Sequence, residues 1–221
     1  MKTLLLLFFM ITCFLFSHAQ ITAVSQVKDV KTTDDCYEAV RNLVERWGLD
    51  ITDLPGKPDS FFAGKPLTRL SFAMQMGPAL SRIMELLEAA SADKSKEEAA
   101  KIKQQFIKSR MKGYHDAAVI KITRVNQYKD IKHSDYYVER IQGLVEMYKL
   151  VLGSKGNLFS PQKTMTYDDL KKIFSTYSNI VGSDIIPSSP KTITRGAWAI
   201  MLDKILNFYQ DDMAELAAGA E

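Results

Sequence analysis

Cysteine is scarce in this sequence, with only Cys13 and Cys36 among 221 residues. Cys13 lies in an apolar run at the N-terminus that has the pattern of a leader peptide, so Cys36 would be the one cysteine of the mature chain. A single cysteine excludes an internal disulfide, a common source of stability in exported proteins. The stability of the mature chain must therefore come from packing.

Histidine is also sparse, and no arrangement typical of a catalytic or metal site occurs. Outside the leader the chain has only His115 and His133. Neither has Cys or acidic neighbours at metal-ligand spacing, and the GxSxG, HExxH and phosphate-loop patterns are missing. We therefore predict that the protein is not an enzyme and that it uses no metal and no other cofactor.

A surplus of charge of one sign is missing too. The formal net charge is +3, and removal of a leader with a single lysine lowers it by one. Nucleic-acid-binding proteins usually carry a marked basic surplus, so we expect no nucleic-acid partner. With 46% hydrophobic and 25% charged residues, the composition is that of an ordinary globular protein.

Residues 1–19 have the features of a secretory signal peptide. One lysine precedes an apolar run over residues 4–16 that is interrupted only by Thr12, and Ala19 supplies a small residue at the expected cleavage point. The run is short for a membrane span. We expect an exported protein of the cell envelope, periplasm or cell surface. A lipid anchor at Cys13 is the alternative, although small residues are lacking before it.

The chain repeats itself in two ways. Residues 27–49 align without a gap with residues 128–150, and both stretches have the apolar spacing of an amphipathic helix. A second motif, LTRLSFAMQMGPAL at residues 67–80, returns as ITRGAWAIMLDKIL at residues 193–206. Its matched apolar positions follow a helical period, and its threonine is placed as an N-cap, as is Thr166 in the second repeat.

The order of these parts resembles the S-layer homology (SLH) domain family. The shared elements are an Asp-Val or Asp-Ile lead at Asp29 and Asp130, an amphipathic first helix, a Phe-containing loop and a Thr-led second helix. The resemblance implies an all-α fold of helix-loop-helix repeats in a pseudo-threefold bundle. It also implies that the Thr-led helices converge and that anionic glycan is held in grooves between repeats.

The three Thr-led helices depart from the Thr-Arg-Ala-Glu pattern that contacts ligand in the family. The first and third read TRLS and TRGA, which keep Arg69 and Arg195 without the acid, whereas the second reads TYDD and keeps Asp169 without the arginine. The third copy also lacks an obvious first helix. In the first copy, Asp35 stands where the family usually has an aromatic residue.

We divide the chain accordingly into a signal peptide (1–19), SLH-like repeat 1 (20–84), an inserted helical segment (85–127), SLH-like repeat 2 (128–181), a partial repeat 3 (182–210) and a tail (211–221). The insertion is rich in Lys, Glu and Ala, and Ser95 with Glu98 forms a capping box ahead of a narrow apolar stripe. We interpret it as a solvated helical hairpin, with a partner-binding arm as the alternative.

Arg69 and Arg195 are the leading candidates for ligand contact. An arginine in the first turn of a helix lies near the positive end of the helix dipole, so it has a reason to face an anion. A guanidinium can hold a carboxylate or phosphate with two parallel bonds, and a salt bridge to a neighbouring repeat is the structural alternative. The other candidates are the acid of the second copy and three aromatic residues that suit either sugar stacking or core packing: Asp169, Trp47, Tyr136 and Tyr148.

These features predict an exported, non-catalytic binding module of the cell envelope. Its expected partner is an anionic cell-wall or surface polysaccharide, or peptidoglycan, held in grooves between SLH-like repeats. A different class is the alternative: a structural or assembly protein of the envelope that has no glycan affinity and binds a protein partner through the inserted helices.

Overall fold

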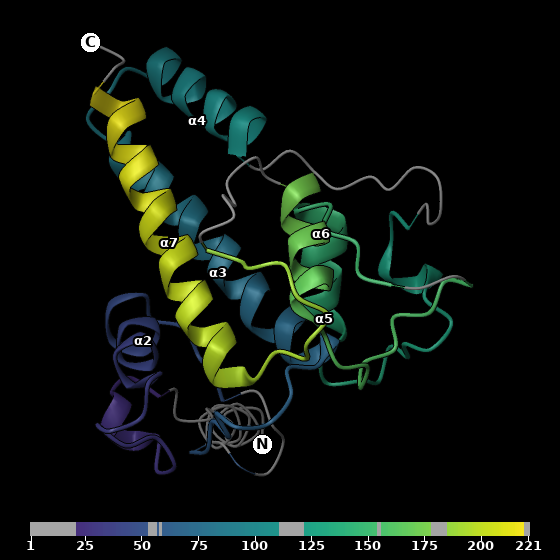
Figure 1. The fold of residues 1–221 in the computed structure, drawn as a ribbon. Coiled ribbons are helices and arrows are strands. Elements are labelled where there is room, and N and C mark those ends of the chain that lie inside the picture. The colour runs from purple at the N-terminus through teal and green to yellow at the C-terminus, as the bar shows by residue number, and fades with distance from the viewer. Residues whose placement is uncertain are drawn as a thin grey trace, which may run out of the picture.

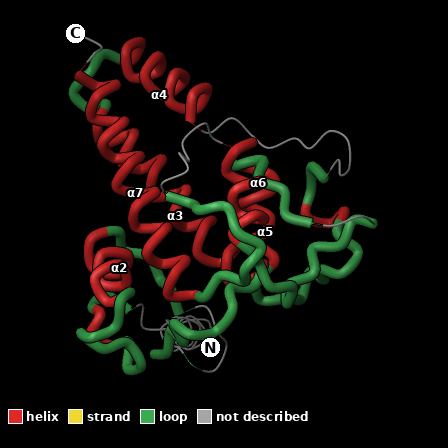
Figure 2. Tube along the Cα trace, viewed as in Figure 1, coloured by secondary structure: helices red, strands yellow, loops and turns green. Residues whose placement is uncertain are grey.

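The computed structural model describes residues 21–52, 57, 59–110, 122–153, 156–177 and 185–218. The predicted signal peptide and Cys13 lie outside the described residues. Within the described ranges the secondary structure is helical, with isolated backbone bridges and no strand, which confirms the all-α prediction (Figure 2). No helix in these ranges is both long enough and apolar enough to cross a membrane.

The two first helices share an irregularity. In the first repeat α2 (Tyr37–Arg41) continues as a π-helical segment, η2 (Asn42–Arg46), and in the second repeat α5 (Val138–Gln142) continues as η4 (Gly143–Met147). A short 3-10 turn precedes each of them, η1 (Val24–Gln26) and η3 (Val125–Gln127). The change from α-helix to π-helix therefore occurs at positions that the sequence alignment pairs.

The remaining helices are α3 (Arg69–Ala90), α4 (Lys96–Arg110), α6 (Tyr167–Tyr177) and α7 (Arg195–Ala218). Of these, α3, α6 and α7 each follow one of the three threonines identified as N-caps, and α4 comes from the insertion. The long helices α3 and α7 contact each other and lie side by side (Figure 1).

An aspartate closes each repeat by capping the loop between its two helices. The Asp29 carboxylate accepts hydrogen bonds from the backbone N–H groups of Phe61 and Phe62, both at 2.7 Å. Asp130 accepts equivalent bonds from Phe159, at 2.8 Å, and from the following residue, at 2.7 Å. Because the Phe61 and Phe159 side chains are fully buried, each aspartate fixes the point at which its loop enters the core.

The three segments that lead into the Thr-led helices join in a ring of backbone hydrogen bonds. The Leu67 N–H donates to the Ile193 carbonyl at 2.8 Å, Ile193 donates to Met165 at 3.0 Å, and Met165 donates back to Leu67 at 2.9 Å. All three side chains are buried. The ring brings the N-termini of α3, α6 and α7 together at one place.

One aromatic side chain from each of these helices meets behind the ring. The Phe72 and Trp198 ring centroids lie 5.0 Å apart, and Phe174 lies 6.4 Å from Phe72 and 6.3 Å from Trp198. All three side chains are fully buried. Aromatic residues bury large apolar areas, so this contact is a main source of the cohesion between repeats.

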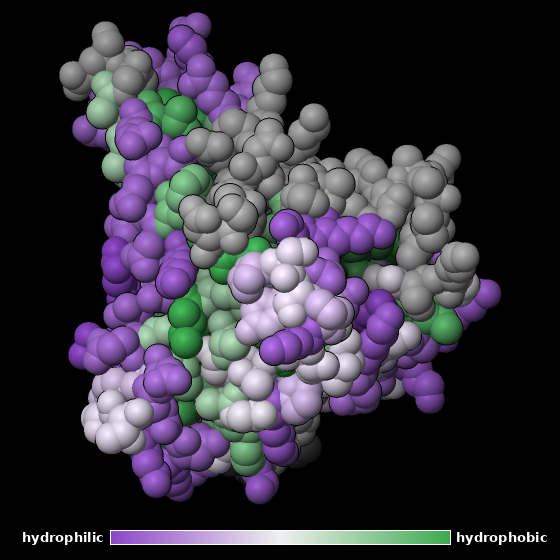
Figure 3. Space-filling view, in the orientation of Figure 1, coloured by the Kyte–Doolittle hydropathy of each residue, from purple (hydrophilic) through white to green (hydrophobic). Residues whose placement is uncertain are grey.

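The insertion folds against the distal part of α7 rather than standing alone. Ser95 and Glu98 form the predicted capping box, and the Phe106 and Tyr209 rings pack at 5.6 Å with both side chains buried. Lys103 also pairs with Glu88 of α3, at 3.0 Å. The outward surface along α7 is hydrophilic, as Figure 3 shows.

Two helical glycines are expected to respond oppositely to alanine. A Cβ at Gly77 would meet Arg140 O at 3.7 Å, an ordinary contact, whereas one at Gly196 would meet Ala63 O and Cys36 Sγ at 3.3 Å. Gly77→Ala should therefore raise the free energy of unfolding by about 0.5–1 kcal/mol, the helix-interior cost of glycine. Gly196→Ala should lower it, and urea unfolding of both variants tests the contrast. Equal effects would contradict the packing described for Gly196.

Candidate functional site

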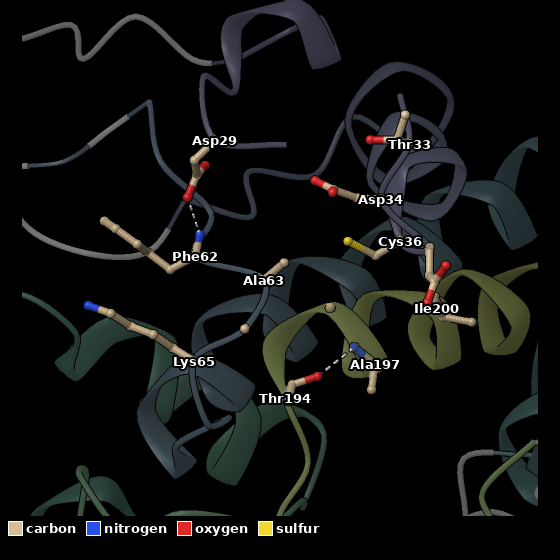
Figure 4. Close-up of a pocket in the computed structure, with 13 residues that line it drawn as sticks. Asp29, Thr33, Asp34, Cys36, Phe62, Ala63, Lys65, Thr194, Ala197 and Ile200 are labelled. Atoms are coloured by element: carbon tan, nitrogen blue, oxygen red, sulfur yellow. Dashed lines mark hydrogen bonds between the residues drawn. The ribbon is translucent and has the colours of Figure 1, made fainter. Parts of the chain in front are cut away.

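A cavity of about 790 Å³ lies where the first repeat meets the start of α7. Figure 4 shows its walls, with the loop around Asp34 and Cys36 on one side, Phe62 and Lys65 on another, and Thr194 at the foot of α7. We call it the repeat 1 groove. Its lining residues are Asp29, Thr33, Asp34, Asp35, Cys36, Phe62, Ala63, Gly64, Lys65, Thr194, Gly196, Ala197 and Ile200.

Backbone hydrogen bonds hold the two walls of the groove together. The first N–H groups of α7 donate to the loop of the first repeat, Arg195 to Lys65 O at 2.9 Å and Gly196 to Ala63 O at 2.8 Å. The third N–H, of Ala197, donates to Thr194 Oγ1 at 3.2 Å, which makes this threonine an N-cap.

The same pattern occurs at the other two Thr-led helices. The first two N–H groups of α3 donate to Lys163 O and Pro161 O, and those of α6 donate to Lys191 O and Ser189 O. A free helix N-terminus attracts anions because its N–H groups lack partners. Here those groups already have partners, so these N-termini are not open anion sites.

Arg195 is fully buried behind the groove, with 1% of its surface exposed. Its guanidinium donates to Phe61 O at 2.6 Å, to Ser71 Oγ at 2.7 Å and to Ile51 O at 3.0 Å. These acceptors are neutral groups of the first repeat, so neither the expected anion nor the alternative salt bridge accounts for these three bonds. The side chain ties α7 to the loop that forms the opposite wall.

Arg69, at the start of α3, has the equivalent position against the loop of the second repeat. It is 8% exposed and donates to Phe159 O at 2.8 Å and to Gly153 O at 3.3 Å. Burial lowers the pKa of its guanidinium from the ordinary value, and the nearby Asp169 carboxylate opposes that shift. Arg69 and Asp169 share a small cavity of about 120 Å³ with the exposed Lys172.

The candidate aromatic residues occupy three different environments. Trp47 is buried, and its indole N–H donates to Asp203 Oδ1 at 3.0 Å. Tyr148 is half-buried with its hydroxyl 2.9 Å from Ser81 Oγ. Tyr136 is 56% exposed. Of the six predicted site residues, Arg69 and Asp169 are brought together, and none of the six lines the repeat 1 groove.

Sequence reasoning missed the residues that line this groove. Asp29 was identified only as part of the repeat lead and Asp35 only as a departure from the family pattern, and the other lining residues were not singled out as ligand contacts. The signal that could have found them is the alignment itself, because it predicts that the lead and the loop of one repeat meet.

Three carboxylates and one lysine ammonium group line the groove. Asp29 accepts from the Phe61 and Phe62 N–H groups, Asp34 accepts from a backbone N–H at 2.8 Å, and Asp35 is exposed. The Lys65 ammonium lies 4.2 Å from the Phe62 ring centroid, within cation–π range.

The groove has no strong cationic character that would attract an anion. Burial and the neighbouring Asp34 carboxylate raise the pKa of the Cys36 thiol, which keeps it neutral. Within the described ranges no cluster of three or more His, Cys, Asp or Glu side chains could hold a metal ion. The arrangement suits a ligand rich in hydroxyl groups, which donate to carboxylates and stack on aromatic faces.

The S-layer homology domain family model matches residues 127–170. This stretch contains the last residue of η3, the first helix of the second repeat, the loop that Asp130 caps, and the start of α6. The helical structure of these residues and the family match therefore concern the same part of the chain.

Two cyanobacterial proteins are similar to part of the chain. An uncharacterized protein of Nostoc sp. is 38% identical over 78 residues, which is 35% of this chain and 13% of that protein. An uncharacterized protein of Synechocystis sp. is 34% identical over 77 residues, 31% of this chain and again 13% of the relative. This chain thus spans about one eighth of the length of these relatives. No solved structure matches it. The family match confirms the resemblance to the S-layer homology domain over residues 127–170.

Proposed function

We propose that this protein is an exported, non-catalytic module that binds a cell-wall polysaccharide in the repeat 1 groove. S-layer homology domains are cell-surface or cell-wall binding modules, and residues 127–170 match that family. The observation that carries the proposal is the position of the cavity of about 790 Å³, between the loop of one repeat and the Thr-led helix of another. We further propose that α3, α6 and α7 are related by a pseudo-threefold axis, because their leading segments exchange equivalent bonds.

The chemistry of the groove narrows the type of sugar. Asp29, Asp34 and Asp35 outnumber the two ammonium groups nearby, that of Lys65 in the lining and that of Lys57 at 5.3 Å from the Phe62 ring centroid. An anionic sugar would therefore meet net repulsion here. A neutral sugar would donate its hydroxyls to the carboxylates and lay an apolar face on the half-exposed Phe62. We therefore assign a neutral, hydroxyl-rich segment of the polymer to this groove.

The alternative, a protein partner bound by the inserted helices, has less support. The apolar stripe of α4 is already used, since Ile102 and Phe106 are 1% and 0% exposed against the rest of the molecule. The exposed side of α4 consists of charged and polar residues such as Glu97 and Lys101. Solvated charged surfaces make poor centres for stable protein interfaces.

A charge-neutral double variant tests the proposal. Asp35→Ala with Lys65→Ala removes one acid and one base from the groove, and both residues are exposed, so folding should be unaffected. We expect co-sedimentation with purified peptidoglycan-polysaccharide complex to weaken about tenfold, the loss of one or two bonds to charged groups. Glu97→Ala with Lys101→Ala on α4 is the matched control. If only the α4 variant loses binding, the polymer binds at the insertion and the assignment to the repeat 1 groove is wrong.

A further inference from the structure

A second cavity, of about 470 Å³, lies on another side of α3, away from the helix N-termini. It is bounded by the end of η2, the middle of α3 and the start of α5. The backbone of α5 comes close to α3 here, because a Cβ at Gly77 would lie 3.7 Å from Arg140 O. We call it the arginine cavity, after three of its lining residues: Arg46, Arg82 and Arg140.

The two acids that line the arginine cavity are already engaged. Glu45 Oε1 accepts from the Val24 N–H at 2.9 Å, and Glu85 Oε2 accepts from Arg82 Nη1 at 2.8 Å. The exposed ion pair with Glu85 therefore offsets part of the charge of one arginine, Arg82. In all, three guanidinium groups and two carboxylates line the cavity. The cavity keeps a positive surplus that the repeat 1 groove lacks.

The arginines retain capacity for a ligand. Arg46 donates only to neutral side chains of α7, Asn207 at 2.7 Å and Gln210 at 2.6 Å. No hydrogen bond or ion pair joins the Arg140 side chain to another described residue, and the Nε of Arg82 is buried without a hydrogen-bond partner. A buried donor without a partner costs free energy, and a bound acceptor would recover it once the Arg82 side chain turns this N–H toward the cavity.

We propose that the arginine cavity is a separate binding site for an oxyanion, a phosphate or carboxylate group, held by Arg82 and Arg140. Guanidinium groups present paired donors in a planar fork that matches both oxyanions, and Arg140 adds its fork to the donors of Arg82 that Glu85 does not occupy. This site does not depend on the repeat 1 groove, because the two cavities have no lining residue in common.

Calorimetric titration of the full chain with sodium phosphate and, in a second arm, sodium acetate tests this site at constant ionic strength kept with chloride. We expect saturable binding of at least one of the two anions, and the stronger arm identifies the oxyanion. Arg82→Gln and Arg140→Gln should each weaken it at least about tenfold, the loss of a charge-assisted pair of bonds. Urea unfolding should show that both variants remain folded, since Arg140 is exposed and Arg82 has only a surface pair.

Arg124→Gln is the control, because it removes the same charge from an exposed position outside the cavity. Unchanged affinity in this variant supports the site, and an equal loss would show that only net charge matters and would overturn it. Heats no different from those of chloride in both arms would also overturn it. The Asp35→Ala and Lys65→Ala double variant should keep its phosphate or acetate affinity, so failure of the groove proposal and failure of this one are distinguishable.

Discussion

Replacing Arg195 by alanine is expected to lower the free energy of unfolding by about 3 kcal/mol or more, because three acceptors lose a charged donor and each unsatisfied buried group costs about 1–3 kcal/mol. The acceptors are Phe61 O, Ser71 Oγ and Ile51 O, all within the first repeat. Lysine at this position should recover only part of the lost stability. It lacks the planar guanidinium fork with which arginine reaches all three acceptors. Urea denaturation followed by circular dichroism measures the change.

Arg46→Ala serves as the control for that experiment. Arg46 also reaches across to another element, α7, with two hydrogen bonds, but it is exposed, so its removal should cost less than about 1 kcal/mol. If Arg195→Ala instead kept its stability and lost wall binding, the arginine would be a ligand contact, as its place in the Thr-Arg motif first suggested.

Deleting residues 191–221 is expected to abolish cooperative unfolding altogether. The deletion removes α7, whose Trp198, Leu202 and Ile205 side chains are fully buried in the common core. Truncating one such side chain costs about 2–5 kcal/mol, and a whole domain is stable by only about 5–15 kcal/mol. The remaining chain should show a broad thermal transition in circular dichroism.

A chain that ends after Gln210 is the matched comparison for this deletion. It keeps Trp198 and Tyr209 and loses little of the core beyond Met213, so a cooperative transition at lower temperature is expected. A melting temperature unchanged by removal of all of α7 would mean that the repeats fold independently, which would contradict the shared core.

Local features of this fold were predictable from sequence because their causes are local. The Thr166 N-cap and the Ser95 and Glu98 capping box form as expected, each between residues three positions apart. Helical periodicity identified the long helices for the same reason. The two copies of the first helix were recognisable because their apolar spacing is the same.

The role of Arg195 was not predictable because its partners are distant in sequence. Ile51 lies 144 positions away and Phe61 lies 134 positions away, so the motif alone gives no sign that the side chain is buried. Its place near the positive end of the helix dipole suggested that Arg195 binds an anion, but the backbone carbonyls of a neighbouring loop provide the same negative potential. Both cavities are likewise built from segments that only the fold brings together.

For the predicted partial repeat 3 we propose a physical reason why it would need no first helix. The first helix α5 packs against α3 at Gly77, where Arg140 O is near. The other first helix packs against α7 at Asp203, which accepts a hydrogen bond from Trp47. In α6 the neighbouring surface carries Lys171 and Lys172, partly or fully exposed, where α3 has Ala73 and Met74. A lysine surface can remain solvated, so α6 does not require a third first helix to cover it, as α5 covers α3 and α2 covers α7.

The most direct test of wall binding at the repeat 1 groove is a nuclear magnetic resonance titration of the full chain with soluble fragments of cell-wall polysaccharide. Backbone amide shifts report where the fragments bind without any substitution. We expect the largest changes at Gly64, Lys65 and Ala197, which line the groove, with α4 unaffected. Changes confined to α4, with Gly64 and Ala197 unmoved at saturating fragment, would contradict the account.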